Sequence, residues 1–300
     1  MNLTGLLGRL RSRILTRLDP FESVRMRRMR KNGTLVAMRD LIPKFKDSTF
    51  FAFATGGSLS NIDGLERIAN HNTLMLTTAP IHFFKMYGVM PNLWLIHNPP
   101  SVRMAIETID EYGLRGKIDF SKTIVLVPDN NSKSKVNFSD INLRRLRKVL
   151  GKTTYALYSE KIYLGTEPIA DFASKKAVPE HYLQTGIEPI ELMNGSSVEA
   201  AFLPFLSFLG VREIYFGGVD HRDTGHFWDR NDPWQEEDGT PKSFSDTDLV
   251  EASGKAAIKE AEAKNISIFR LEPEMTALTH YDHIDFETAL QRATDRPAIH

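Results

Sequence analysis

The densest cluster of polar side chains lies between residues 220 and 229, directly after a predicted strand at 212–219. Its members that could act on a substrate are Asp220, His221, Arg222, Asp223 and His226. Such a set could ligate a metal, transfer protons, or form a solvated loop whose charges pair with one another. The two histidines are five residues apart in a predicted loop, a spacing that matches no standard ligand set. Chemistry without a metal is therefore the favoured interpretation.

A glycine-rich turn follows an earlier apolar run at 48–55 and consists of Thr55, Gly56, Gly57 and Ser58. Paired glycines allow backbone N–H groups and a helix N-terminus to approach a phosphate, and Ser58 could cap that helix. The turn lacks the Gly-x-Gly-x-x-Gly of dinucleotide sites and the lysine of a P-loop. A phosphate-binding turn and a tight turn without a ligand both stay open.

A third polar position is Asn98, which stands between His97 and the pair Pro99 and Pro100. The two prolines fix the backbone directly after a predicted strand. They would hold the Asn98 amide in one place, where it is suited to reading the edge of a base or a sugar.

These groups need a scaffold, and the chain predicts a single doubly wound, mostly parallel α/β sheet, a Rossmann-like fold. Strands are expected at 48–55, 73–78, 92–97, 123–127, 212–219 and 266–270. Helices are expected at 60–70, after Pro80, and at 101–113, 138–150, 196–209 and 249–264. Residues 151–193 give no clear pattern, and 280–283 resemble a surface turn. Because ligands bind at the carboxyl ends of the strands in such sheets, the polar groups that follow strands should gather there.

Two segments at the margins of this scaffold stand out. Residues 230–247 show no apolar periodicity yet contain Trp234 and Phe244, which favours a lid at about 229–247 over a solvated linker. Residues 1–31 carry nine basic side chains against Asp19 and Glu22. Leucine and isoleucine recur there at helical spacing until Pro20, so we expect residues 1–33 to form a basic amphipathic segment. It could lie on an anionic membrane surface, or pack on its own domain or a second subunit.

The composition limits the classes of protein to which the chain can belong. The chain has 300 residues, 41% of them hydrophobic and 25% charged, which is typical of one globular domain, predicted here at 34–300. No apolar run is long enough to span a membrane, and the 38 basic and 38 acidic residues balance, which disfavours a nucleic-acid partner. The absence of cysteine excludes disulfides and thiolate chemistry and fits a cytoplasmic location.

The order of these pieces resembles the small bacterial sialyltransferases that use CMP-sialic acid, with their superfamily of motility accessory factors and pterin pyrophosphokinase-like domains. The resemblance covers roughly residues 48–280. The turn at 54–63 stands where the family has Gly-Asn-Gly-Pro-Ser-Leu and a stretch ending in Ile-Asp, and Asn98 matches its Asn-Pro. Gly-Ser-Ser-Val at 195–198 matches a helix start, and Ile-Tyr-Phe-Gly-Gly-Val-Asp at 214–220 matches a strand.

The resemblance implies a sialyltransferase-type GT-A variant that moves sialic acid, another nonulosonate or Kdo from a CMP-activated donor to a surface glycan or glycolipid, with inversion. The positions that it assigns to the nucleotide and the donor sugar are Thr55, Gly56, Gly57, Ser58, Thr78, Asn98, Ser196, Ser197 and Trp228. Two family tyrosines that contact the leaving phosphate fall on Arg222 and Trp228. The family's lid histidine falls on Ser243 and Phe244, so His226, and after it His221, are the nearest candidates for a general base, beside Arg222 and Asp220.

No metal or other cofactor is expected, because the lid carries no paired carboxylate motif resembling Asp-x-Asp and Arg222 can engage phosphate oxygens bidentately. We expect a peripheral protein at the inner membrane face, held by its N-terminal helix, and a homo-oligomer is open. Two alternatives stay open as well. One is an ATP-dependent, pyrophosphokinase-like transferase of the same superfamily, and the other is a non-catalytic, membrane-associated protein that binds nucleotide sugars.

Overall fold

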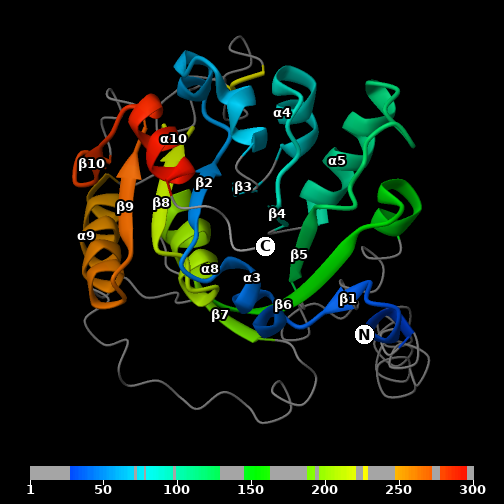
Figure 1. Cartoon of the computed structure of the whole chain (residues 1–300), viewed down its shortest axis with the longest axis horizontal. Coiled ribbons are helices and arrows are strands. Elements are labelled where there is room, and N and C mark those ends of the chain that lie inside the picture. Colours follow the sequence, from blue (N-terminus) through cyan, green and yellow to red (C-terminus); the bar gives the residue numbers. More distant parts are fainter. Residues whose placement is uncertain are drawn as a thin grey trace, which may run out of the picture.

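The structure is a computed structural model. It describes residues 28–70, 73–77, 79–96, 99–128, 145–162, 188–192, 196–220, 226–228, 247–271 and 278–295. Within these ranges the chain forms one α/β unit built on a large parallel sheet (Figure 1).

The sheet has ten strands in the described part of the chain, and every pairing among them is parallel. They are β1 (Leu35–Val36), β2 (Thr49–Phe53), β3 (Leu74–Leu76), β4 (Leu93–Leu95), β5 (Ile124–Pro128), β6 (Thr154–Ile162), β7 (Glu188–Leu192), β8 (Glu213–Gly217), β9 (Ser267–Arg270) and β10 (Asp282–His283). All residues of β2, β5 and β8 are buried. Such continuous apolar runs are typical of parallel strands that are covered on both faces.

The strand order is β1-β6-β5-β4-β3-β2-β8-β9-β10, with β7 also paired to β6. The chain winds outward from β2 through β3, β4, β5 and β6, and later returns to pair β8 with the other side of β2. The winding therefore reverses between β2 and β8. In doubly wound sheets this switch point is where ligands bind, outside the carboxyl ends of the strands.

Helices cover both faces of the sheet. They are η1 (Met38–Leu41), α3 (Ile42–Phe45), η2 (Gly57–Asn61), η3 (Leu65–Asn70), α4 (Pro80–Tyr87), α5 (Pro99–Glu111), η5 (Val198–Phe202), α8 (Leu203–Phe208), α9 (Thr247–Ala263) and α10 (Phe286–Thr294). Alternate side chains of β2 pack against the helices on opposite faces of the sheet. Phe50 joins the core formed with α8 and α9, whereas Phe51 contacts Phe286 of α10 and Phe53 contacts Phe83 of α4.

The predicted doubly wound α/β fold is confirmed, and so are the six predicted strands. Two expectations are corrected, and one undecided stretch receives its structure. The helix expected at 60–70 is two short 3₁₀ helices, η2 and η3. The undecided stretch at 151–193 contains β6 and β7. The expected surface turn at 280–283 instead includes the buried Tyr281 and the strand β10.

The two marginal segments lie mostly outside the described residues. Residues 1–27 and 229–246, which hold most of the predicted N-terminal segment and lid, are among the undescribed ones. Residues 28–31 are helical and lead through Gly33 into β1, and Thr247 begins α9. Among the described helices, none is long and apolar enough to cross a membrane.

Candidate functional site

The turn after β2 lies directly against the end of β8, at the switch point. The Ala54 N–H donates to the Gly217 carbonyl at 3.0 Å, and the Gly56 N–H donates to the Gly218 carbonyl at 2.7 Å. Gly218 has φ +68°, and a Cβ there would lie 3.0 Å from the Ala54 oxygen. Glycine is therefore required at 218 both by its left-handed backbone and by the close approach of the two chains.

Asp220 fastens this turn from the β8 side. Its carboxylate accepts the Ser58 N–H at 2.8 Å and also the Ser58 hydroxyl. A Cβ on Gly56 would lie 2.5 Å from the Asp220 Cγ, so the carboxylate occupies the space that the missing side chain leaves. The expectation that Ser58 caps the helix is wrong: η2 follows Gly56 with no side-chain cap, and the Ser58 hydroxyl is bound by Asp220.

The chain that follows β8 returns to the same turn. His226 forms an antiparallel bridge with Gly56, and the Phe227 N–H donates to the Thr55 carbonyl at 3.1 Å. The His226 ring stacks on Trp228, with 4.3 Å between centroids and 7° between planes. The polar cluster after β8 thus brings an imidazole and an indole to the glycine turn after β2.

The other face of Trp228 carries a residue that sequence reasoning missed. His82 of α4 stacks on Trp228 at 4.2 Å and 5°, so the indole lies between two imidazoles. The His82 Nδ1 lies 2.8 Å from the Tyr112 hydroxyl. Burial, together with the charge of nearby His226, lowers the pKa of His82 to about 4, so His82 is neutral at pH 7.

Ser196 and Ser197 stand at the start of η5, and Ser196 has hydrogen bonds of its own. Its N–H donates to Glu199 Oε2 at 2.6 Å, its hydroxyl donates to the same oxygen, and the Tyr281 hydroxyl donates to Oε1 at 2.6 Å. Glu199 is fully buried, and this burial raises the pKa of its carboxyl above the usual range. The cluster ties η5 to the segment before β10.

We expect Tyr281→Phe to destabilise the protein by about 1–3 kcal/mol, because it removes a hydrogen bond to a buried carboxylate. The pKa of Glu199 is higher in the folded protein than in the unfolded chain. The free energy of unfolding therefore falls as pH rises above the ordinary pKa of glutamate. The variant raises that pKa further, so urea unfolding should show a larger loss at pH 8 than at pH 4. In a Glu199→Gln background the difference between the two pH values should vanish, and its persistence would contradict this account.

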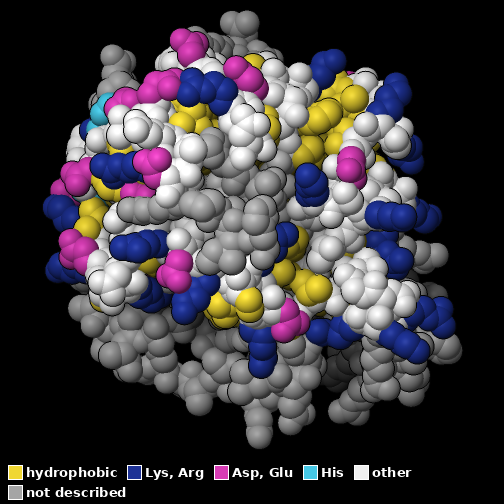
Figure 2. Space-filling view, viewed as in Figure 1, with side chains coloured by type: hydrophobic (Ala, Val, Ile, Leu, Met, Phe, Trp, Pro, Cys, Tyr) yellow, Lys and Arg dark blue, Asp and Glu magenta, His cyan; other side chains and the backbone are white. Residues whose placement is uncertain are grey.

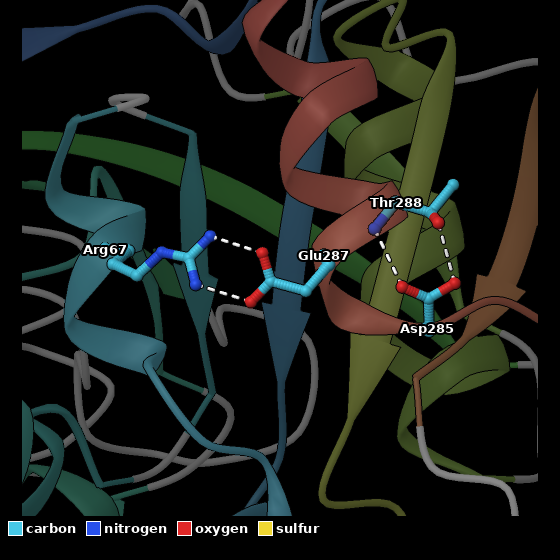
Figure 3. Close-up of polar contacts among 4 residues, drawn as sticks. All are labelled: Arg67, Asp285, Glu287 and Thr288. Atoms are coloured by element: carbon cyan, nitrogen blue, oxygen red, sulfur yellow. Dashed lines mark hydrogen bonds and ion pairs between the residues drawn. The ribbon is translucent and has the colours of Figure 1, made fainter.

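A polar groove of about 340 Å³ lies between η3 and α10 and is lined by Arg67, Asn70, Glu287, Thr288, Leu290, Gln291 and Thr294. Figure 3 shows the guanidinium of Arg67 meeting the carboxylate of Glu287 across it, with nitrogen–oxygen distances of 2.5 and 2.6 Å. Asp285 caps α10 by accepting the Thr288 N–H at 2.9 Å (Figure 3). None of the predicted site residues lines this groove, and the exposed ion pair adds little stability in water.

The predicted site residues therefore divide into three groups. Seven lie together at the switch point: Thr55, Gly56, Gly57, Ser58, Asp220, His226 and Trp228. Ser196 belongs to the Glu199 cluster, and its neighbour Ser197 is the N-cap residue of η5. The remaining ones, Thr78, Asn98, His221 and Arg222, lie outside the described residues, as do His97 and Asp223.

In the described part of the chain, no group of three or more histidine, aspartate or glutamate side chains is arranged to hold a metal ion. Comparison with models of known protein families finds no match, and comparison with curated proteins finds no significantly similar sequence. The site combines the glycine turn after β2, a carboxylate that binds Ser58 of that turn, and an imidazole held beside it.

Proposed function

We propose that the protein is a glycosyltransferase that moves sialic acid, another nonulosonate or Kdo from a CMP-activated donor to a surface glycan or glycolipid, with inversion. The observation that carries the proposal is the bridge between Gly56 and His226. It brings together, at the switch point, the glycine turn that the sialyltransferase resemblance assigns to the donor nucleotide and an imidazole that can accept a proton. The sialyltransferase-like order of motifs supports the choice of a CMP-sugar.

In this proposal the donor's ribose and phosphate lie across the turn at Gly56 and Gly57. Asn98 and Thr78, which follow the neighbouring strands in the sequence, read the nucleotide. Arg222 neutralises the phosphate that leaves, so that no metal is needed. Asp220 positions the turn by accepting hydrogen bonds from the Ser58 N–H and the Ser58 hydroxyl.

His226 is the proposed general base. Transfer to an acceptor hydroxyl requires a group that titrates near neutral pH within hydrogen-bond reach of that hydroxyl. The half-buried His226 ring is held by its stack on Trp228, which fixes the plane of the imidazole. The segment at about 229–247 begins directly after Trp228 and is the proposed lid over the acceptor. A peripheral position at the inner membrane face, through the N-terminal helix, completes the proposal.

CMP should stabilise the folded protein, by about 2.7 kcal/mol at 100 times its dissociation constant. Thermal unfolding with CMP, UMP, GDP and ATP plus Mg²⁺ measures this directly. Transfer from a CMP-sugar should also survive EDTA. A shift with ATP and Mg²⁺ but not with CMP would replace the proposal by the pyrophosphokinase-like alternative. CMP binding without transfer from any CMP-sugar would favour the non-catalytic one.

A further inference from the structure

Positive charge in the described part of the chain is concentrated in the two segments that lead into the neighbouring strands β1 and β6. Residues 28–34 lead into β1, and residues 145–153 lead into β6, which pairs with β1 through Leu35 and Tyr155. These two segments carry seven cations and no carboxylate: Arg28, Arg30, Lys31, Arg145, Arg147, Lys148 and Lys152. The whole chain carries equal numbers of basic and acidic residues, so this grouping is a strong local departure from the average.

Packing holds the two segments together with their charges outward. Met29 of the first segment and Leu146 and Leu150 of the second are buried in one hydrophobic cluster. Arg28 and Arg147, the immediate neighbours of Met29 and Leu146, are exposed. Figure 2 shows many lysine and arginine side chains, and few acidic ones, over the side of the molecule that carries β1 in Figure 1. We name the seven residues above the basic face.

A pocket lies within the basic face, where its two segments meet. It has a volume of about 270 Å³ and is lined by Arg28, Met29, Asn32, Thr34 and Arg147. Arg28 and Arg147, one from each segment, thus flank the same hollow. Arginine pairs of this kind suit the planar, multidentate recognition of phosphate oxygens.

The basic face lies at the end of the sheet opposite the switch point. Its segments run into the amino ends of β1 and β6, whereas Gly56 and Asp220 follow the carboxyl ends of β2 and β8. Because all of these strands are parallel, their amino ends lie at one end of the sheet and their carboxyl ends at the other. A ligand at the pocket is therefore distinct from the donor nucleotide.

We propose that the basic face binds the anionic headgroups of a membrane, with one lipid phosphate seated between Arg28 and Arg147. Charge complementarity to an anionic leaflet is the first argument. The second is that neither 28–34 nor 145–153 contains a phenylalanine, tyrosine or tryptophan, so nucleic-acid bases would find no ring to stack on. The third is continuity, since Arg28, Arg30 and Lys31 belong to residues 1–33, which are predicted to form a basic amphipathic segment. The proposal is independent of the chemistry at the switch point.

The test uses the full chain and vesicles of phosphatidylcholine with 30% phosphatidylserine, compared with pure phosphatidylcholine. Arg28→Glu and Arg147→Glu should each weaken binding to the anionic vesicles about fivefold or more, and the double variant about 25-fold or more, because each cation near such a surface contributes about 1 kcal/mol. The matched control is Lys259→Glu, which reverses an exposed cation on α9 and should change binding less than about twofold. Binding should also fall steeply with added salt.

Two results would overturn the proposal. One is a double variant that still binds anionic vesicles within about twofold of the unaltered protein. The other is a double variant with unchanged vesicle binding that has lost affinity for a short RNA or DNA duplex, which would assign the face to nucleic acid. Unfolding midpoints and the CMP-induced shift should be the same in all variants. Loss of the CMP shift alone would count against the proposed function and not against this one.

Discussion

His226→Ala should lower turnover by about 10²–10⁴-fold while CMP affinity changes by less than about twofold. The imidazole is the proposed proton acceptor, whereas the contact of residue 226 with Gly56 runs through the backbone and survives the substitution. The measurement is steady-state transfer from the true CMP-sugar donor, paired with CMP titration. A separation of turnover from nucleotide affinity is expected because the acceptor hydroxyl, not the nucleotide, needs the base.

Two control variants distinguish proton transfer from loss of ring packing. His226→Phe keeps a ring on Trp228 but cannot accept a proton, so its turnover should fall as far as that of the alanine variant. His82→Ala uncovers the other face of Trp228 and should cost far less, because His82 is neutral and contacts Trp228 and Tyr112. Near-normal turnover of His226→Ala would move the role of base to His221 or a carboxylate. An equal loss in His82→Ala would show that the stack, and not the base, is what matters.

The strands and their winding could be read from the sequence because parallel strands covered on both faces are continuous apolar runs. β2 and β5 are such runs, and each of their residues is buried. β7 escaped notice because two of its five residues are glutamates and one is proline. β10 has only two residues, and both are exposed. Where a strand is short or polar, its pairing partner rather than its own pattern decides that it forms.

The residues at the switch point could be predicted from the sequence to the same extent as the strands. Residues that closely follow a strand, such as Gly56 and Asp220, could be found from the sequence because sheet topology brings strand ends together. His82 could not, since it lies inside α4 and its stacking partner Trp228 is far along the chain. The burial of Tyr281 was missed for the same reason, because its ring packs on Phe216 and its hydroxyl donates to Glu199, both far along the chain. Pairs that only tertiary packing creates leave no local signal.

Gly56→Ala should destabilise the protein by about 1–3 kcal/mol, and this loss should disappear when Asp220 is also replaced by alanine. The backbone of Gly56 is extended, with φ −64° and ψ 150°, and any residue can adopt it. The cost of a side chain therefore comes from its collision with the Asp220 carboxylate, which two hydrogen bonds from Ser58 hold in place. Without that carboxylate, alanine at 56 should be neutral or stabilising by up to about 1 kcal/mol, since it restricts the unfolded chain.

Urea unfolding of the four proteins, namely the unaltered chain, each single variant and the double variant, gives the coupling energy between the two positions. The matched control is Gly151→Ala. A Cβ there meets nothing within 4 Å, although φ is +66°, so its cost is backbone strain alone. It should be equally destabilising with Asp220 or with alanine at 220. If Gly56→Ala and Asp220→Ala add to within about 0.5 kcal/mol, the carboxylate does not hold the turn against β8, and the role given to Asp220 in positioning the glycine turn must be abandoned.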